Sequence, residues 1–171
     1  MTFQNNHFYR NMEFDSIKEY FFKLRNALYF TLLIPLVLFI GILYLYVGQW
    51  TIGVKQPLLI VSFLLFLMTV DWLIGILLFR TKLKKIRRRI GLRLKLEQYY
   101  WLTIVRSWIN ILACFFPAIG FLLTSNFILA YIFGFDLVLV FIFWPRARKV
   151  CRDLKLKGDE LEMVLYKKDT F

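Results

Sequence analysis

The sequence has few of the residues from which catalytic and metal sites are built. Its 171 residues include a single histidine, His7, and two cysteines. Because His7 lies near the N-terminus, no histidine pair for haem, no histidine-containing metal cluster and no nucleophilic triad can form in the apolar segments. A phosphate-binding glycine loop and a Walker motif are also missing. The sequence therefore predicts a non-enzymatic protein with no cofactor and no bound metal.

The two cysteines do not indicate a disulfide framework. Cys114 lies inside an apolar run and Cys151 lies in a basic segment, so the two side chains are expected at different depths and should not pair. A reactive Cys114 would need a nearby base, and its segment offers none.

What the sequence has instead is long apolar runs beside a large positive charge. Hydrophobic residues make up 60% of the chain, aromatic residues 19%, and the net charge is +12. Four runs approach or exceed the roughly 20 residues that a membrane-spanning helix needs; they cover residues 27–46, 57–79, 99–124 and 126–145. Helices of a soluble bundle would show polar faces, and these runs are apolar nearly all round. The predicted fold is an all-α integral membrane protein with four transmembrane helices.

Basic residues flanking the runs predict the orientation. The link at 80–98 has nine basic residues and one acidic residue, the tail at 146–171 has eight and five, and the leader at 1–26 has four and three. The other connections, residues 47–56 and a turn at Ser125, hold one lysine between them. Since lysine and arginine are retained on the cytoplasmic side, the leader, the link and the tail are all expected there.

The basic link allows two interpretations. It could contact anionic lipid headgroups or a protein partner, or it could bind nucleic acid. The first is favoured because topology and anionic lipid already account for such charge. Apolar residues recur every three or four positions, which predicts an amphipathic helical hairpin broken near Gly91. The basic residues are Arg80, Lys82, Lys84, Lys85, Arg87, Arg88, Arg89, Arg93 and Lys95.

The leader carries a helix start signal. Ser16 followed by Glu19 has the form of a capping box, so a helix is expected to begin near Ile17 and to run unbroken into the membrane. Its first turns carry an apolar stripe that should rest on the interface or on a neighbour. The stripe consists of Ile17, Tyr20, Phe21, Leu24 and Leu28.

The tail carries weaker signals. A helix continuing from the fourth run over residues 146–157 is expected to end in a turn at Gly158 and Asp159. After this turn, Leu161, Met163 and Leu165 alternate with polar residues, which is compatible with a short strand, although so brief a run can also be a helix. A strand would need something to pair with, which favours a protein partner.

Three charged residues lie inside the apolar runs: Asp71, Arg106 and Asp136. Such charges are costly and normally face the bundle interior or water. Counted from the nearest cytoplasmic flank, all three lie roughly 12 to 15 Å deep at 1.5 Å per helical residue. Equal depth on antiparallel neighbours predicts that Arg106 pairs with Asp71 and that Asp136 completes a triad.

The third run supports a polar interior. Several of its small and polar residues recur at intervals of three or four, which places them on one helix face that should turn toward the bundle or a partner protein. They are Thr103, Arg106, Asn110, Ala113, Pro117 and Gly120. The predicted intramembrane polar network joins Asn110 to the triad. It either fixes helix register or carries a proton or cation; the first is favoured because a proton path needs several titratable groups in series.

Two classes of function stay open. The scarcity of catalytic groups and the unequal charge of one arginine against two aspartates favour a small non-enzymatic subunit or assembly factor of a larger membrane complex. The alternative is a small oligomeric channel or proton-coupled transporter that uses the intramembrane carboxylates. The expected partners are membrane lipids, including anionic headgroups, and either other membrane proteins or further copies of the chain. Frequent phenylalanine, isoleucine and lysine fit a bacterial cytoplasmic (inner) membrane.

Overall fold

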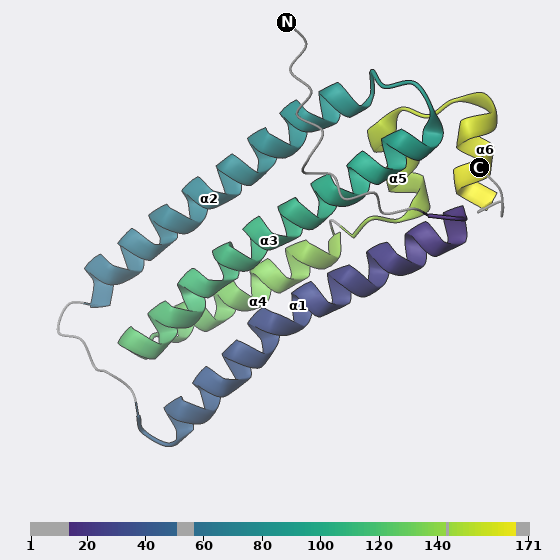
Figure 1. Cartoon of the computed structure of the whole chain (residues 1–171). Coiled ribbons are helices and arrows are strands. Elements are labelled where there is room, and N and C mark those ends of the chain that lie inside the picture. The colour runs from purple at the N-terminus through teal and green to yellow at the C-terminus, as the bar shows by residue number, and fades with distance from the viewer. Residues whose placement is uncertain (1–13, 51–56, 143, 167–171) are drawn as a thin grey trace, which may run out of the picture.

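The structure is a computed structural model that describes residues 14–50, 57–142 and 144–166. Within these ranges it consists of six helices and contains no strand (Figure 1). The helices are α1 (Ile17–Val47), α2 (Pro57–Ile86), α3 (Leu92–Thr124), α4 (Phe127–Ile142), α5 (Ala147–Leu154) and α6 (Gly158–Tyr166). The first three are each long and apolar enough to cross a membrane, and α4 is a shorter apolar helix. The prediction of an all-α fold with long apolar helices is confirmed.

The start of α1 follows the predicted capping box. The Ser16 hydroxyl accepts a hydrogen bond from the backbone N–H of Glu19 at 3.2 Å, and the Glu19 carboxylate accepts one from the backbone N–H of Asp15 at 2.8 Å. Both bonds satisfy backbone donors that a helix start leaves free. The helix then continues without a break through Pro35 to Val47.

The predicted hairpin of α2 and α3 is present. α2 continues past its apolar run to Ile86 and α3 begins at Leu92. Between them Gly91 has a φ of 96°, a conformation that glycine adopts at little cost because it has no Cβ. The break in the helical hairpin therefore lies where the sequence placed it.

The central element is α3, which lies between α2 on one side and α1 and α4 on the other (Figure 1). Two glycines allow close approach to it. A Cβ added at Gly75 of α2 would lie 3.0 Å from the side chain of Ile109, and one added at Gly120 of α3 would lie 2.6 Å from Leu64. These two contacts fix how α2 and α3 are aligned along their length.

Two separate cores hold the helices together. The charged-end core lies at the end of the molecule where α1 begins, α2 turns into α3, and α5 and α6 pack (Figure 1). Its buried residues are Phe14, Ile17, Tyr20, Leu24, Leu28, Phe79, Leu83, Ile86, Leu96, Tyr99, Tyr100, Leu102, Val150, Cys151, Leu154, Leu156 and Val164. The far-end core joins the four helices α1, α2, α3 and α4 at the opposite end of the molecule. Its buried residues are Ile42, Val61, Cys114, Ala118, Phe121, Leu129 and Phe133.

The structure corrects two expectations for the tail. α4 ends at Ile142 and α5 begins only at Ala147, because Pro145 lacks a backbone N–H and disfavours a helical conformation at Trp144. The tail is therefore not a continuation of the fourth helix. The compatible strand after Gly158 is a helix, α6, in which Val164 is fully buried against the charged-end core.

Candidate functional site: a cationic cavity at the charged end

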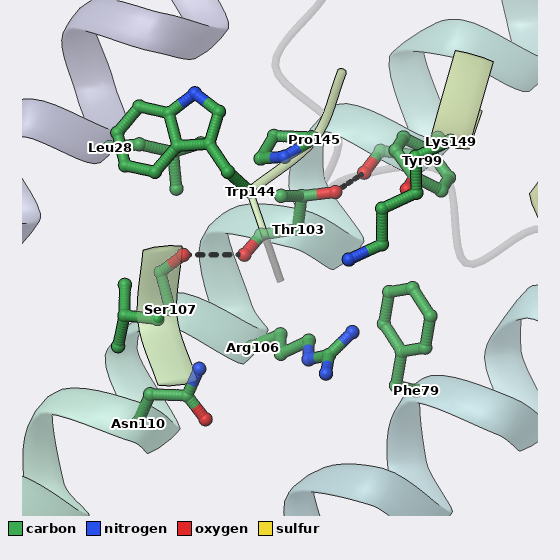
Figure 2. A pocket seen from close by; sticks show the side chains of 11 residues that line it. Leu28, Phe79, Tyr99, Thr103, Arg106, Ser107, Asn110, Trp144, Pro145 and Lys149 are labelled. Atoms are coloured by element: carbon green, nitrogen blue, oxygen red, sulfur yellow. Dashed lines mark hydrogen bonds between the residues drawn. The ribbon is translucent and has the colours of Figure 1, made fainter. Parts of the chain in front are cut away.

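A small cavity lies where the charged-end core meets the apolar part of the bundle (Figure 2). Its volume is about 30 Å³, enough for roughly two water molecules. Most of its polar lining residues come from α3, and Lys149 comes from α5. Apolar side chains of α1, α2 and α4 and the Trp144–Pro145 segment complete the lining. The lining residues are Leu28, Phe79, Tyr99, Thr103, Arg106, Ser107, Asn110, Val140, Trp144, Pro145 and Lys149.

The polar face of α3 turns inward, as its spacing predicts. Thr103, Ala113, Pro117 and Gly120 are buried, and Arg106 is half-buried. The hydroxyl groups on this face are engaged within the helix: Thr103 donates to the carbonyl of Tyr99 at 2.8 Å and Ser107 donates to the carbonyl of Thr103 at 3.0 Å. Both Thr103 and Ser107 line the cavity.

Arg106 is held against an aromatic ring. Its guanidinium carbon lies 4.5 Å from the centroid of the Phe79 ring on α2, a cation–π contact that contributes on the order of 1 kcal/mol. Figure 2 shows the guanidinium group of Arg106 and the ammonium group of Lys149 both directed toward the side of the cavity where Phe79 lies. The cavity thus brings together two cations from helices far apart in the sequence.

The surroundings of Lys149 lower its pKa. Lys149 lies on α5, where burial of its ammonium group, reinforced by the positive charges of Arg106 and Arg152, lowers its pKa to about 8 against the opposing effect of Asp153. A lysine in water keeps its proton to much higher pH. The lowered pKa therefore reflects mainly the burial of the Lys149 ammonium group and, to a smaller extent, the positive charges beside it.

Asp153 organises the site, although the sequence analysis did not single it out. Its carboxylate accepts a hydrogen bond from the hydroxyl of Tyr99 at 2.9 Å, and its backbone carbonyl accepts one from the guanidinium group of Arg87. These bonds tie α5 to α3 and to the α2–α3 turn. The one available signal is its place four residues after Lys149, since residues so spaced are neighbours on a helix.

The two intramembrane aspartates lie away from Arg106. Asp136 is 2% exposed, and neither of its carboxylate oxygens has a hydrogen-bond partner; one buried oxygen of Asp71 also has none. Asp136 therefore makes no hydrogen bond to Arg106, and neither aspartate lines the cavity that holds Arg106. The structure therefore brings Arg106 and Asn110 into one cavity and leaves both carboxylates outside it.

A register difference explains this separation. Gly75 lies opposite Ile109, so Asp71, four residues earlier on the antiparallel helix, lies opposite residue 113. That position is about seven residues from Arg106, or roughly 10 Å along the helix axis. Arg106 meets Phe79 instead of Asp71 for this reason.

A second small cavity adjoins the first between α1, α3 and α4. Its volume is about 20 Å³, and it shares Ser107, Asn110 and Trp144 with the cationic cavity while also reaching Cys114. Asp136 is close enough to Cys114 to act on its thiol electrostatically. The lining of this second cavity is mostly apolar, and Asp136 is not part of it.

The basic link is used in two ways. Arg87 bonds to α5, Lys95 forms an ion pair with Glu160 of α6 at 2.7 Å, and Arg93 pairs with Glu97 at 3.6 Å. The first two interactions hold the tail helices to the hairpin. The other basic positions are exposed; they are Arg80, Lys82, Lys84, Lys85, Arg88 and Arg89.

His7 lies outside the described residues, as do the rest of the leader up to residue 13, residues 51–56 of the first connection, residue 143 and the end of the tail from residue 167. In the part of the chain that the structure describes, no group of three histidine, cysteine or acidic side chains is arranged to hold a metal ion. Comparison with protein-family models, with curated proteins and with solved structures found no match to this chain.

Proposed function

We propose that this protein is a small, non-enzymatic integral membrane subunit or assembly factor that works within a larger membrane protein complex. The observation that carries the proposal is Asp71 of α2, which is half-buried and has one buried carboxylate oxygen with no hydrogen-bond partner among the described residues. The proposal includes four membrane crossings and a cytoplasmic charged end.

The case for a fourth crossing comes from the connection between α3 and α4. α3 ends at Thr124, the left-handed conformation of its C-cap residue Ser125 with φ 52° reverses the chain, and α4 returns beside α3 (Figure 1). If α3 crosses the bilayer, the helix that runs back along it must cross as well. With 16 residues, α4 spans about 24 Å.

The orientation follows from where the charges meet. The start of α1, the α2–α3 turn, α5 and α6 gather at one end of the molecule (Figure 1), and most of the basic residues lie in these segments or directly beside them. Retention of lysine and arginine places that end in the cytoplasm. The exposed basic residues of the hairpin would then lie near anionic headgroups. The composition fits a bacterial cytoplasmic membrane.

One buried oxygen of Asp71 has no partner among the described residues, and in our proposal a second protein supplies it. Asp71 is half-buried on α2, a helix that packs on α3 and leaves most of its apolar surface uncovered. A carboxylate at this depth is costly unless it is bonded or reaches water. A polar side chain or a small-residue face on a partner helix, docked along the α2–α3 seam, would satisfy it.

The test is replacement of Asp71 in the native membrane. Asp71→Leu should remove the cross-helix bond and shift the tagged protein from a large complex to a smaller species on native gels, while Asp71→Asn should retain part of the complex. The matched control is Thr69→Val on the same helix, because the Thr69 hydroxyl donates only to its own helix at Leu65. An unchanged complex in Asp71→Leu would overturn the proposal.

A specific observation also supports the alternative function, a proton-coupled carrier. Asp136 is buried without a hydrogen-bond partner and lies near Cys114, which lines the second of two adjoining small cavities. Isolated carboxylates in membrane proteins often belong to proton or ion paths. This function predicts proton flux in proteoliposomes that Asp136→Asn abolishes and Asp71→Asn leaves in place. Equal flux in Asp136→Asn and in the unmodified protein would reject it.

A further inference from the structure

A larger groove lies beside the cationic cavity, on the outer side of the Trp144–Pro145 segment. Its volume is about 580 Å³, within the range of sites that hold a small-molecule-sized group. One wall is the first two turns of α1 and the other is the segment that leads from Trp144 into α5. The groove and the cationic cavity share Trp144 and Pro145 as a common wall.

The groove is basic on both walls. Lys18 and Arg25 line it from α1, and Arg146 lines it from the opposite side. The one acidic residue of the lining, Glu19, is already balanced by Lys23 at 2.6 Å and by the backbone N–H of Asp15. Arg106 and Lys149 add positive charge from behind the shared wall. An occupant of the groove is therefore expected to be an anion.

The groove also lies at the boundary between charged and apolar surface. Arg25 comes just before the apolar run of α1, and Arg146 comes just after the run of α4. The Trp144 ring lies 5.1 Å from the ring of Tyr29, and such aromatic pairs are typical of the membrane–water interface. The groove thus opens at the level of lipid headgroups.

Below the groove, α1 presents an uncovered apolar face. Phe22 borders the groove. Phe30, Leu33 and Val37 follow it on the same side of the helix. All four side chains are exposed. An occupant with an anionic head and an apolar tail would match both regions at once. A soluble anion or an acidic peptide would use only the charged part.

We propose that the groove between the start of α1 and the Trp144–Ala147 segment binds the phosphate-bearing headgroup of an anionic phospholipid, whose acyl chain lies along Phe30, Leu33 and Val37. This site is separate from the exposed basic residues of the α2–α3 hairpin. The inference rests on the membrane placement proposed above. Failure of this inference would be distinguishable from failure of the proposed function, because complex formation through Asp71 does not depend on the groove.

Native mass spectrometry of the full chain in mild detergent would test the site. Phosphatidylglycerol should bind the unmodified protein more tightly than phosphatidylcholine, and Arg25→Gln combined with Arg146→Gln should weaken phosphatidylglycerol binding about ten-fold or more. The matched control, Lys84→Gln with Arg88→Gln, removes two exposed charges from the hairpin and should retain the preference. Equal weakening in both double variants, or no weakening in the groove variant, would overturn the proposal.

A second measurement needs no substitution. Phosphatidylglycerol with a photoreactive headgroup should crosslink the unmodified protein within residues 14–29 and 144–147. Crosslinks confined to residues 80–98 would overturn the proposal. Displacement of the lipid by inorganic phosphate alone would also overturn it, since the groove would then recognise a free anion and not a phospholipid.

Discussion

In the membrane placement proposed above, the two cores of this protein lie in different solvents. The charged-end core joins five helical segments around aromatic and aliphatic side chains and is surrounded by basic residues. The far-end core joins four helices through small residues and stacked rings, such as Phe39 and Phe133 at 4.0 Å. The first resembles a small soluble domain that excludes water. The second packs where lipid tails are as apolar as the side chains, so close fit is its main stabilising contribution.

The largest expected effect is on the free energy of unfolding, when one buried leucine is truncated to alanine in each core. Leu24 and Leu129 are both fully buried. Leu24→Ala should lower the free energy of unfolding by about 3 kcal/mol, because it loses burial from water and leaves a cavity. Leu129→Ala should cost about 1 kcal/mol, since lipid replaces part of what is lost. Steric trapping in bicelles would measure both, and equal losses would mean that the two cores share one environment.

A smaller effect is expected from filling the close helix contact at the far end. In Gly120→Ala the added Cβ would lie 2.6 Å from Leu64 and 2.8 Å from Leu129. Both neighbours are flexible side-chain ends, so the loss should be about 1–2 kcal/mol. Gly134→Ala is the control, because nothing lies within 4 Å of its Cβ position. If both substitutions are neutral in the same bicelle measurement, close packing does not hold the far end together.

The smallest expected effect is a pH dependence confined to the charged end. Lys149 has a pKa of about 8 in the folded protein, with Arg106, Arg152 and Asp153 facing it, and an ordinary lysine pKa near 10.4 when unfolded. Between these values the unfolded chain binds more protons, so stability should rise with pH across this window. Lys149→Gln should flatten the rise in thermal unfolding, whereas Lys84→Gln at an exposed position should not. A rise of equal size in both variants would contradict the assignment to Lys149.

Local signals in the sequence were reliable where a few neighbouring residues decide the outcome. The capping residues Ser16 and Glu19 located the start of α1, and Gly91 located the turn of the hairpin. The inward face of α3 followed from its spacing alone. The alternation after Gly158 was ambiguous because a run of three apolar residues fits the two-residue period of a strand and the 3.6-residue period of a helix. In the structure the segment is helical, and its Val164 packs against the charged-end core.

The candidate site was harder to predict because it depends on distant parts of the chain. Arg106 was expected opposite Asp71 from equal depth, but the contacts of Gly75 with Ile109 and Gly120 with Leu64 set a different register. Lys149 reaches the cavity only because Pro145 ends α4 and redirects the chain into α5. Neither effect leaves a pattern within any one segment.

The sequence by itself determined that the chain forms long apolar helices with a basic end, because helix length, hydropathy and capping are properties of neighbouring residues. Only the tertiary structure decided which side chains meet. Helix register depends on side-chain fit between elements far apart in the sequence, and a shift of two turns is enough to place Arg106 against an aromatic ring and leave two carboxylates elsewhere.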